Sequence, residues 1–164
     1  MSRPLGDTLP DDLQTLLGGH ELADRMGQAI LIATTDTRGW PHLALVSYGE
    51  VVAADCRRLR LALSRASGTS GNLRRNGRLT LGLLGAERAY YVKALARAQR
   101  DPMDGFAHLT RFEAMVEMVL ADEAREEHES GARLTGGITF HPGRPVEETL
   151  QGWQAVVDAL RRDA

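Results

Sequence analysis

Residues 57–84 read RRLRLALSRASGTSGNLRRNGRLTLGLL, and this stretch decides the fold. It joins an alternating apolar run, a small polar loop, a short basic segment and a second apolar run. Leu59, Leu61 and Leu63 share one face of an extended chain, while the other face carries two arginines and an alanine, which predicts a half-buried strand. The whole stretch therefore predicts a strand, a polar turn, a short helix and another strand.

The polar loop, residues 64–71, is a run of hydroxyl side chains and glycines, and residues 72–76 after it can form a short helix. Ser67 or Thr69 is expected to cap that helix. A helix start with free amide groups, several hydroxyls and an arginine is suited to hold an anion such as a phosphate monoester. The alternative is a capped turn without a ligand, because turns rich in serine and glycine are common before helices.

Extended runs continue on both sides of this stretch. Residues 28–36 are rich in β-branched side chains, and the turn at residues 37–39 leads into another such run, which predicts a hairpin. Residues 112–120 fit a helical stripe and a strand equally well, so periodicity leaves both open. Five successive strands suggest a barrel. They occupy residues 28–36, 42–48, 59–63, 78–84 and 89–98, and a final strand is expected at 134–140.

Helices are expected at both ends of the chain. One begins at Asp11 or Asp12 after a flexible start, and residues 145–162 form a terminal helix with one apolar face. The charge-rich residues 122–130 are interpreted as a solvated loop. The chain then divides into an N-terminal helical segment (1–27), a barrel (28–140) and a C-terminal helix (144–162), all within one domain.

The composition restricts the class of protein. The chain has 164 residues, of which 43% are hydrophobic and 26% charged, as in an ordinary soluble globular domain. Its net charge of −2 gives no case for nucleic acid, and no run of about 18 apolar residues indicates a membrane span. Cys56 is the only cysteine, which excludes an internal disulfide. We expect a cytoplasmic protein that binds neither nucleic acid nor membrane.

The residues identify no catalytic motif. The chain contains no nucleophile elbow, Walker loop or Gly-x-Gly-x-x-Gly turn. Its five histidines are dispersed, and no two have the spacing that would set two ligands on one helical face. No metal site is predicted, and the catalytic residues are unknown at this point.

Two motifs in order carry a family resemblance. Residues 36–42 (DTRGWPH) are followed by an extended run, a further strand and then residues 67–76 (SGTSGNLRRN). From about Ile30 to Ala98 the chain resembles the pyridoxamine 5'-phosphate oxidase-like superfamily of FMN-binding split-barrel proteins. The resemblance implies a mainly β fold. It is a split β-barrel of six or seven mostly antiparallel strands, with short flanking helices and a C-terminal helix, and it places a strand at residues 112–120.

The resemblance also implies a cofactor and a partner. Proteins of this kind bind FMN, less often a deazaflavin or haem, at the interface of a homodimer, and the flavin performs the redox chemistry. An FMN-dependent oxidoreductase acting on an unidentified small molecule is therefore expected. The implied contacts are Ser64, Arg65, Ser67, Thr69 and Ser70 for the FMN phosphate, Leu45, Val46 and Ser47 for the ring edge or ribityl chain, and Tyr91 across the interface. The alternative for Leu45 and Val46 is packing in the core, and for Tyr91 it is core or dimer packing.

The chain departs from the family pattern at the phosphate site. Many flavin-binding members have a lysine where this chain has Thr69, and the pyridoxamine oxidases carry an arginine where it has His42-Leu43. Each charge-assisted contact is worth roughly 1.5–3 kcal/mol, so tight FMN binding would require Arg65 or Arg74 to substitute. These departures motivate one alternative, a split barrel without flavin that serves as a small-ligand-binding or interaction module.

A second alternative is haem binding, which some relatives perform. It would take an axial ligand from His42, His108 or His141.

Overall fold

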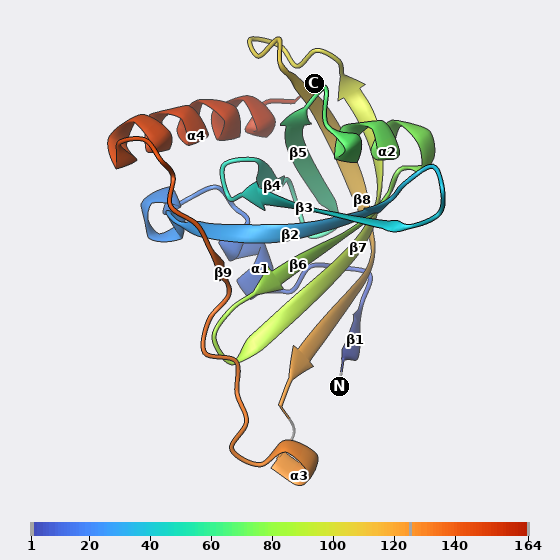
Figure 1. Cartoon of the computed structure of the whole chain (residues 1–164), viewed down its shortest axis with the longest axis vertical. Helices are drawn as coiled ribbons and strands as arrows, with labels where there is room; N and C mark the ends of the chain where they lie inside the picture. The colour runs from blue at the N-terminus through green and yellow to red at the C-terminus, as the bar shows by residue number, and fades with distance from the viewer. Residues whose placement is uncertain (1, 125, 164) are drawn as a thin grey trace.

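The computed structural model describes residues 2–124 and 126–163, and one antiparallel sheet dominates this part of the chain (Figure 1). Its strand order is β3-β2-β6-β7-β8-β5-β4, with β1 paired to β8 and β9 paired to β2. The strands are β1 (Arg3–Gly6), β2 (Gln28–Thr35), β3 (Pro41–Ser47), β4 (Val51–Ala53), β5 (Arg58–Ser64), β6 (Arg78–Leu84), β7 (Arg88–Arg100), β8 (Leu109–Glu123) and β9 (Ile138–Thr139).

Five helical segments accompany the sheet in the described residues. Figure 1 shows α2 and α4 at one end of the molecule and α3 at the other. None of the helices described is long and apolar enough to cross a membrane. The segments are α1 (Asp11–Leu16), the 3₁₀ helix η1 (Leu22–Arg25), α2 (Gly68–Asn76), α3 (Glu126–Glu129) and α4 (Val146–Arg161).

The sheet curls because its two ends are joined by a very short connection. β3 and β4 stand at opposite ends of the strand order, yet only residues 48–50 separate them in sequence. A flat sheet of this order could not satisfy that connection, since neighbouring strands lie about 4.8 Å apart. The split-barrel prediction is confirmed, and the strands that were not predicted are the short β1 and β4.

Apolar side chains fill the space inside the curled sheet. Phe112 of β8 and Leu81 of β6 are fully buried there, as are Ile30 and Ile32 of β2. Leu59, Leu61 and Leu63 of β5 also join this core, as the alternation in the sequence predicts. One contiguous cluster therefore holds the barrel together.

The prediction that β5 is buried on one face only is wrong, because its second face is covered as well. Arg60 and Ala62 are buried there. Arg60 Nη1 donates to the carbonyl of Leu160 (3.0 Å), and Arg111 of β8 donates to the carbonyl of Ala159 (3.0 Å). The final carbonyls of a helix have no partner within it, so two buried arginines on neighbouring strands fasten the end of α4 to the sheet.

The structure settles the ambiguous segments. Residues 112–120 form a strand, part of the long β8, and the terminal helix is confirmed as α4. The predicted strand at 134–140 shortens to β9. The prediction of a solvated loop at 122–130 is wrong, because β8 continues to Glu123 and α3 follows at Glu126–Glu129. Residue 125 lies outside the described part. The flexible start is wrong too, because β1 pairs with β8.

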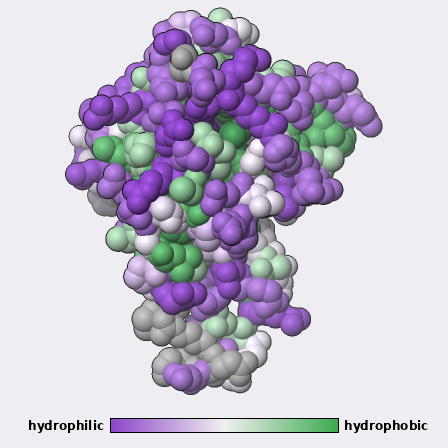
Figure 2. Space-filling model, turned by 180° about the vertical axis from the view of Figure 1, so that it is seen from behind, coloured by the Kyte–Doolittle hydropathy of each residue, from purple (hydrophilic) through white to green (hydrophobic). Residues whose placement is uncertain are grey.

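The face in Figure 2 is largely hydrophilic, and hydrophobic residues come to the surface there in small, separate groups.

The turn between β3 and β4 is packed tightly. Glu50 accepts hydrogen bonds from the backbone N–H (2.6 Å) and the hydroxyl (2.8 Å) of Ser47. Gly49 lies directly under Trp153 of α4, and a Cβ at Gly49 would come within 2.3 Å of Trp153 Cγ. The helix can approach this turn only because residue 49 has no side chain.

We expect Gly49→Ala to destabilise the protein by about 1–3 kcal/mol, because the added methyl group would displace Trp153 and overpack the contact. Gly152→Ala is the matched control. A Cβ at Gly152, in the middle of α4, meets no atom within 4 Å, so this change should stabilise by up to about 1 kcal/mol. The free energy of unfolding, measured in denaturant, checks both, and a neutral Gly49→Ala would contradict the packing argument.

Candidate functional site

The start of α2 is built by a local network of serines. Ser67 is the N-cap, and its Oγ accepts a hydrogen bond from the backbone N–H of Ser70 (3.1 Å). The hydroxyls of Ser67 and Ser70 both donate to the carbonyl of Ser64, at 2.9 and 2.7 Å. Ser70 is therefore a buried structural residue, and Ser67 is the predicted cap.

Two backbone amides at the helix start keep their donors available. Within the described residues, the N–H groups of Gly68 and Thr69 form no hydrogen bond. The first amides of a helix carry partial positive charge and attract anions. Ser64, at the end of β5, is exposed beside them, whereas the side chain of Thr69 is buried.

His42 of β3 also reaches this point. A Cβ built on Gly68 would lie 3.2 Å from Cε1 and 3.4 Å from Nε2 of the His42 ring. The sequence suggested His42 only as a haem ligand, whereas the structure places its imidazole against the first residue of α2. Nothing local predicts this contact, because β3 and α2 are brought together only by the curl of the sheet.

Arg65 and Arg74 share one carboxylate. Arg65 Nε lies 2.6 Å from Asp101 Oδ1, and Arg74 Nη2 lies 2.8 Å from Asp101 Oδ2. Arg74 also donates to the Arg65 carbonyl (3.2 Å) and to the hydroxyl of Thr110 (2.7 Å). Arg65 Nη2 has no hydrogen-bond partner among the described residues. The cluster has a net charge of +1, and Arg65 keeps a free donor.

The three predicted contacts on β3 face different surroundings. Leu45 is 54% exposed, whereas Val46, on the opposite side of the strand, is buried in the core. Ser47 is bonded to Glu50 through both its backbone N–H and its hydroxyl. Val46 can contact a ligand only through its backbone, because its side chain is enclosed.

Tyr91 shares an outer row of the sheet with Leu45. The cross-strand pairs run from Leu45 to Leu31, from Leu31 to Gly82, and from Gly82 to Tyr91. Three strand spacings separate Leu45 from Tyr91, or about 14 Å. A single chain therefore does not bring these two residues into contact, but both belong to the same exposed surface.

This outer face of β3, β2, β6, β7 and β8 carries several exposed apolar side chains. A pocket of about 530 Å³ opens on it near the tip of the β2–β3 hairpin, with Ala33, Thr80 and Lys93 in its lining. Exposed apolar surface of this kind marks interaction sites. Its most exposed apolar side chains are Leu43, Leu45, Leu95, Met115 and Met118.

The part of the chain that the structure describes holds no cluster of three or more potential metal ligands.

Asp101 gives the arginine cluster a pH dependence. Hydrogen bonds from Arg65, then from Thr110 and Arg74, hold the pKa of the Asp101 carboxyl below its ordinary value. A carboxyl whose pKa is lowered by folding stabilises the protein above its unfolded pKa of about 3.9, and this contribution is lost as the pH falls through the lower folded value. The contribution should therefore be present at neutral pH and absent in strong acid.

We expect Asp101→Asn to lower the free energy of unfolding at pH 7 and to lose that effect at a pH well below about 3.9, where the wild-type carboxyl is protonated. Denaturant unfolding at the two pH values measures the difference. Asp104→Asn is the control, because Asp104 is 89% exposed and lies 3.6 Å from Arg100. Equal destabilisation by Asp101→Asn at both pH values would show that charge is not the cause.

Known proteins share this fold. No protein-family model matches the chain. The uncharacterized protein YclD of Bacillus subtilis is 32% identical over 155 residues, which is 94% of this chain and 96% of YclD. A candidate pyridoxamine 5'-phosphate oxidase from Lactobacillus delbrueckii is similar in structure, with a TM-score of 0.53 and 17% identity over 71% of this chain and 98% of its own.

An FMN-binding protein from Syntrophomonas wolfei has a TM-score of 0.52 and 12% identity, over 70% of this chain and 90% of its own. The TM-scores establish a shared fold, and the match to YclD covers nearly the whole of both chains. The chain therefore belongs to the same family as YclD, and its fold is that of the pyridoxamine 5'-phosphate oxidase-like split-barrel proteins.

Proposed function

We propose that this protein binds FMN and acts as a flavin-dependent oxidoreductase on a small molecule that is not identified. The observation that carries the proposal is the start of α2, where two unpaired amides, an exposed serine and an imidazole lie together. One of the similar structures is that of an FMN-binding protein, which supports the same cofactor.

The phosphate of FMN would take the free N–H groups of Gly68 and Thr69. Ser64 would add its hydroxyl group and His42 would approach from β3, whereas the Ser67 hydroxyl already donates its hydrogen to the Ser64 carbonyl. Helix starts bind phosphate because several N–H groups and the helix dipole point at one position. These residues fit a phosphate monoester, although the lysine and the arginine of related proteins are missing.

Arg65 is the residue best placed to restore the missing charge. Its ion pair with Asp101 is partly exposed, with side-chain exposures of 46% and 29%. Exposed pairs of this kind contribute about 0.2–1 kcal/mol, whereas a charge-assisted contact with phosphate contributes about 1.5–3 kcal/mol. Turning Arg65 from Asp101 toward a phosphate is therefore favourable. Arg74, with its donors engaged, would stay and hold Asp101 in place.

The outer face of the sheet would carry the remaining contacts. Leu45 and Tyr91 are on this face, about 14 Å apart within one chain. A second copy packed on the face would bring the partner's own outer row beside Leu45, so a homodimer allows residues that are distant in one chain to line one site. Bound FMN would supply hydride or single-electron transfer, and the protein would bind and orient it.

A second candidate function is favoured by the pairing of both arginines with Asp101. With Thr69 in place of a lysine, and with no arginine free of a carboxylate at the cluster, the chain would be a split barrel without flavin that binds another small ligand. The same experiment separates the two candidates.

The first prediction concerns the phosphate. FMN should bind at least about tenfold more tightly than riboflavin, which lacks the phosphate group. Arg65→Ala should weaken FMN binding by about tenfold or more, and Asp101→Asn should strengthen it, because it frees Arg65. Neither variant should change riboflavin binding. Quenching of flavin fluorescence on titration measures the affinities, and an absorption spectrum of protein purified without added cofactor shows whether flavin is retained.

The control is Arg144→Ala, which removes an exposed arginine whose contact with Glu148 is 3.6 Å. If the cluster had only a structural role, Arg65→Ala and Asp101→Asn would change the affinity for FMN in the same direction. The proposal requires Arg65→Ala to weaken FMN binding and Asp101→Asn to strengthen it. Protein that is colourless and takes up no FMN overturns the flavin proposal in favour of the second candidate. A haem absorption band would overturn both.

The second prediction concerns the dimer. Leu45→Asp should convert a dimer to a monomer at micromolar concentration and weaken FMN binding, while the fold is kept because Leu45 is already 54% exposed. Val146→Asp is the matched control, because Val146 is 45% exposed at the start of α4, away from the outer face. Sedimentation velocity measures the oligomeric state. A wild-type protein that is monomeric would contradict the shared site.

A further inference from the structure

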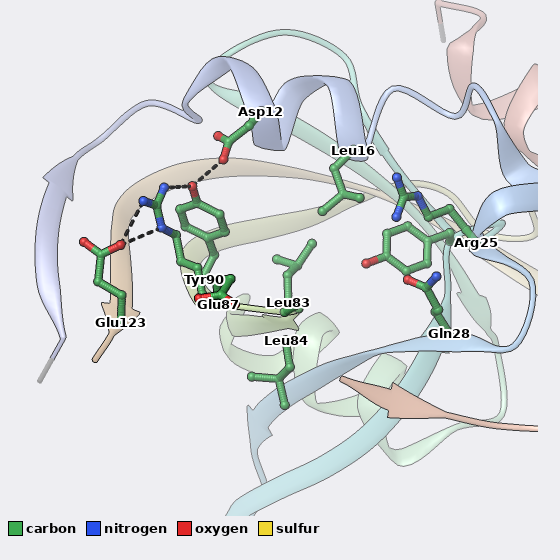
Figure 3. A pocket seen from close by; sticks show the side chains of 13 residues that line it. Asp12, Leu16, Arg25, Gln28, Leu83, Leu84, Glu87, Tyr90 and Glu123 are labelled. Carbon is green, nitrogen blue, oxygen red and sulfur yellow. Dashed lines mark hydrogen bonds and ion pairs between the residues drawn. The ribbon is translucent and has the colours of Figure 1, made fainter. Parts of the chain in front are cut away.

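A second pocket lies at the other end of β6 from α2 (Figure 3). α2 leads into the start of β6 at Arg78, whereas Leu83 and Leu84 at its end line this pocket. The length of the strand, about 20 Å, separates the two places. The volume of about 360 Å³ is enough for a small organic molecule.

The polar groups on one wall of the pocket already have hydrogen-bond partners. The Tyr90 hydroxyl donates a hydrogen bond to Asp12, and Arg88 donates to the Tyr90 oxygen (2.8 Å) and to Glu123 (2.9 Å). Figure 3 shows Asp12, Tyr90 and Glu123 together on this side, joined by dashed lines. Because these groups pair with one another, they offer a ligand little unused hydrogen-bonding capacity.

The opposite wall is different, and Figure 3 shows Arg25 and Gln28 on it. Within the described residues, Arg25 forms no hydrogen bond or ion pair. Its guanidinium carbon lies 5.9 Å from the centre of the Tyr48 ring. A guanidinium with only an aromatic ring beside it retains its full set of donors for a ligand. Gln28 donates to the Asp24 carbonyl (3.0 Å), which fixes its amide.

Tyr48 contributes a second unused donor. The residue is 6% exposed, and its hydroxyl has no hydrogen-bond partner in the described part of the chain. No side-chain oxygen described is both fully buried and unpaired, so this hydroxyl keeps its small exposed area where Tyr48 lines the pocket. Burial raises the pKa of Tyr48 against the opposing effect of Arg25, so the phenol stays protonated and can donate.

We propose that this pocket binds a small organic monocarboxylate, with Arg25 and Tyr48 holding the carboxylate and Leu16 and Leu83 contacting the apolar body. The planar guanidinium matches a carboxylate with two parallel hydrogen bonds. The acidic side chains of Asp12, Glu87 and Glu123 also line the pocket, and they repel a doubly charged phosphate more strongly than a singly charged carboxylate. This site is additional to the proposed FMN site and does not depend on it.

The test is a titration followed by amide ¹H–¹⁵N NMR spectra. The probes are sodium benzoate, the uncharged benzyl alcohol and inorganic phosphate. Benzoate should shift the amide signals of residues 25, 28 and 48 in a saturable manner, and the alcohol should not. Phosphate should shift the amide signals of residues 68 and 69 instead. Benzoate shifts confined to other regions, or phosphate shifts at residue 25 as large as those of benzoate, would overturn the proposal.

Two variants locate the contact. Arg25→Gln and Tyr48→Phe should each weaken benzoate binding, the first by about tenfold or more. Arg38→Gln is the control, because it removes the same charge from the exposed turn at the far end of β2. Unchanged binding in Arg25→Gln overturns the proposal. If that variant does not fold, Tyr48→Phe decides, because it removes only the hydroxyl and keeps the buried ring.

Discussion

The three-residue connection between β3 and β4 is the constraint on which the rest of the structure depends. It joins the two ends of the strand order, and so the sheet must close on itself around one core. The closeness of Gly49 to Trp153 fixes the middle of α4 over this turn, and Arg60 and Arg111 fasten the C-terminal end of that helix. Without the curl, β3 could not carry His42 to the start of α2.

The balance of charge around α2 explains how the chain departs from its relatives. A surface carboxylate between two arginines contributes little to stability, because exposed ion pairs are weak. Its main effect is to keep Arg65 and Arg74 in place and to lower their combined charge. Under the proposed function, an incoming phosphate would compete with Asp101 for the donors of Arg65, so one carboxylate would tune the affinity where related proteins have a lysine at the position of Thr69.

The sequence predicts the features that depend only on residues close to one another along the chain. The alternation in β5 identifies a strand, and the spacing of Ser67 before α2 identifies its cap, because both patterns depend on neighbouring residues. Burial of Arg60 could not be foreseen, since the covering helix lies about a hundred residues later in the chain. Asp101 was missed for a similar reason. It belongs to the connection between β7 and β8, where no pattern links a carboxylate to arginines before and within α2.

The β6–β7 hairpin contributes side chains to two surfaces, the pocket at the end of β6 and the outer face of the sheet. Neighbouring residues of a strand point to opposite faces, so Tyr90 lines this pocket while Tyr91 belongs to the outer face. In the same way, Leu83 lines the pocket and Gly82 belongs to the outer face. The side chains of each surface can therefore be changed without replacing those of the other. Because Arg25 and Tyr48 come from outside this hairpin, the pocket depends on the closed sheet and on η1 packing beside it, and no short stretch of sequence could reveal it.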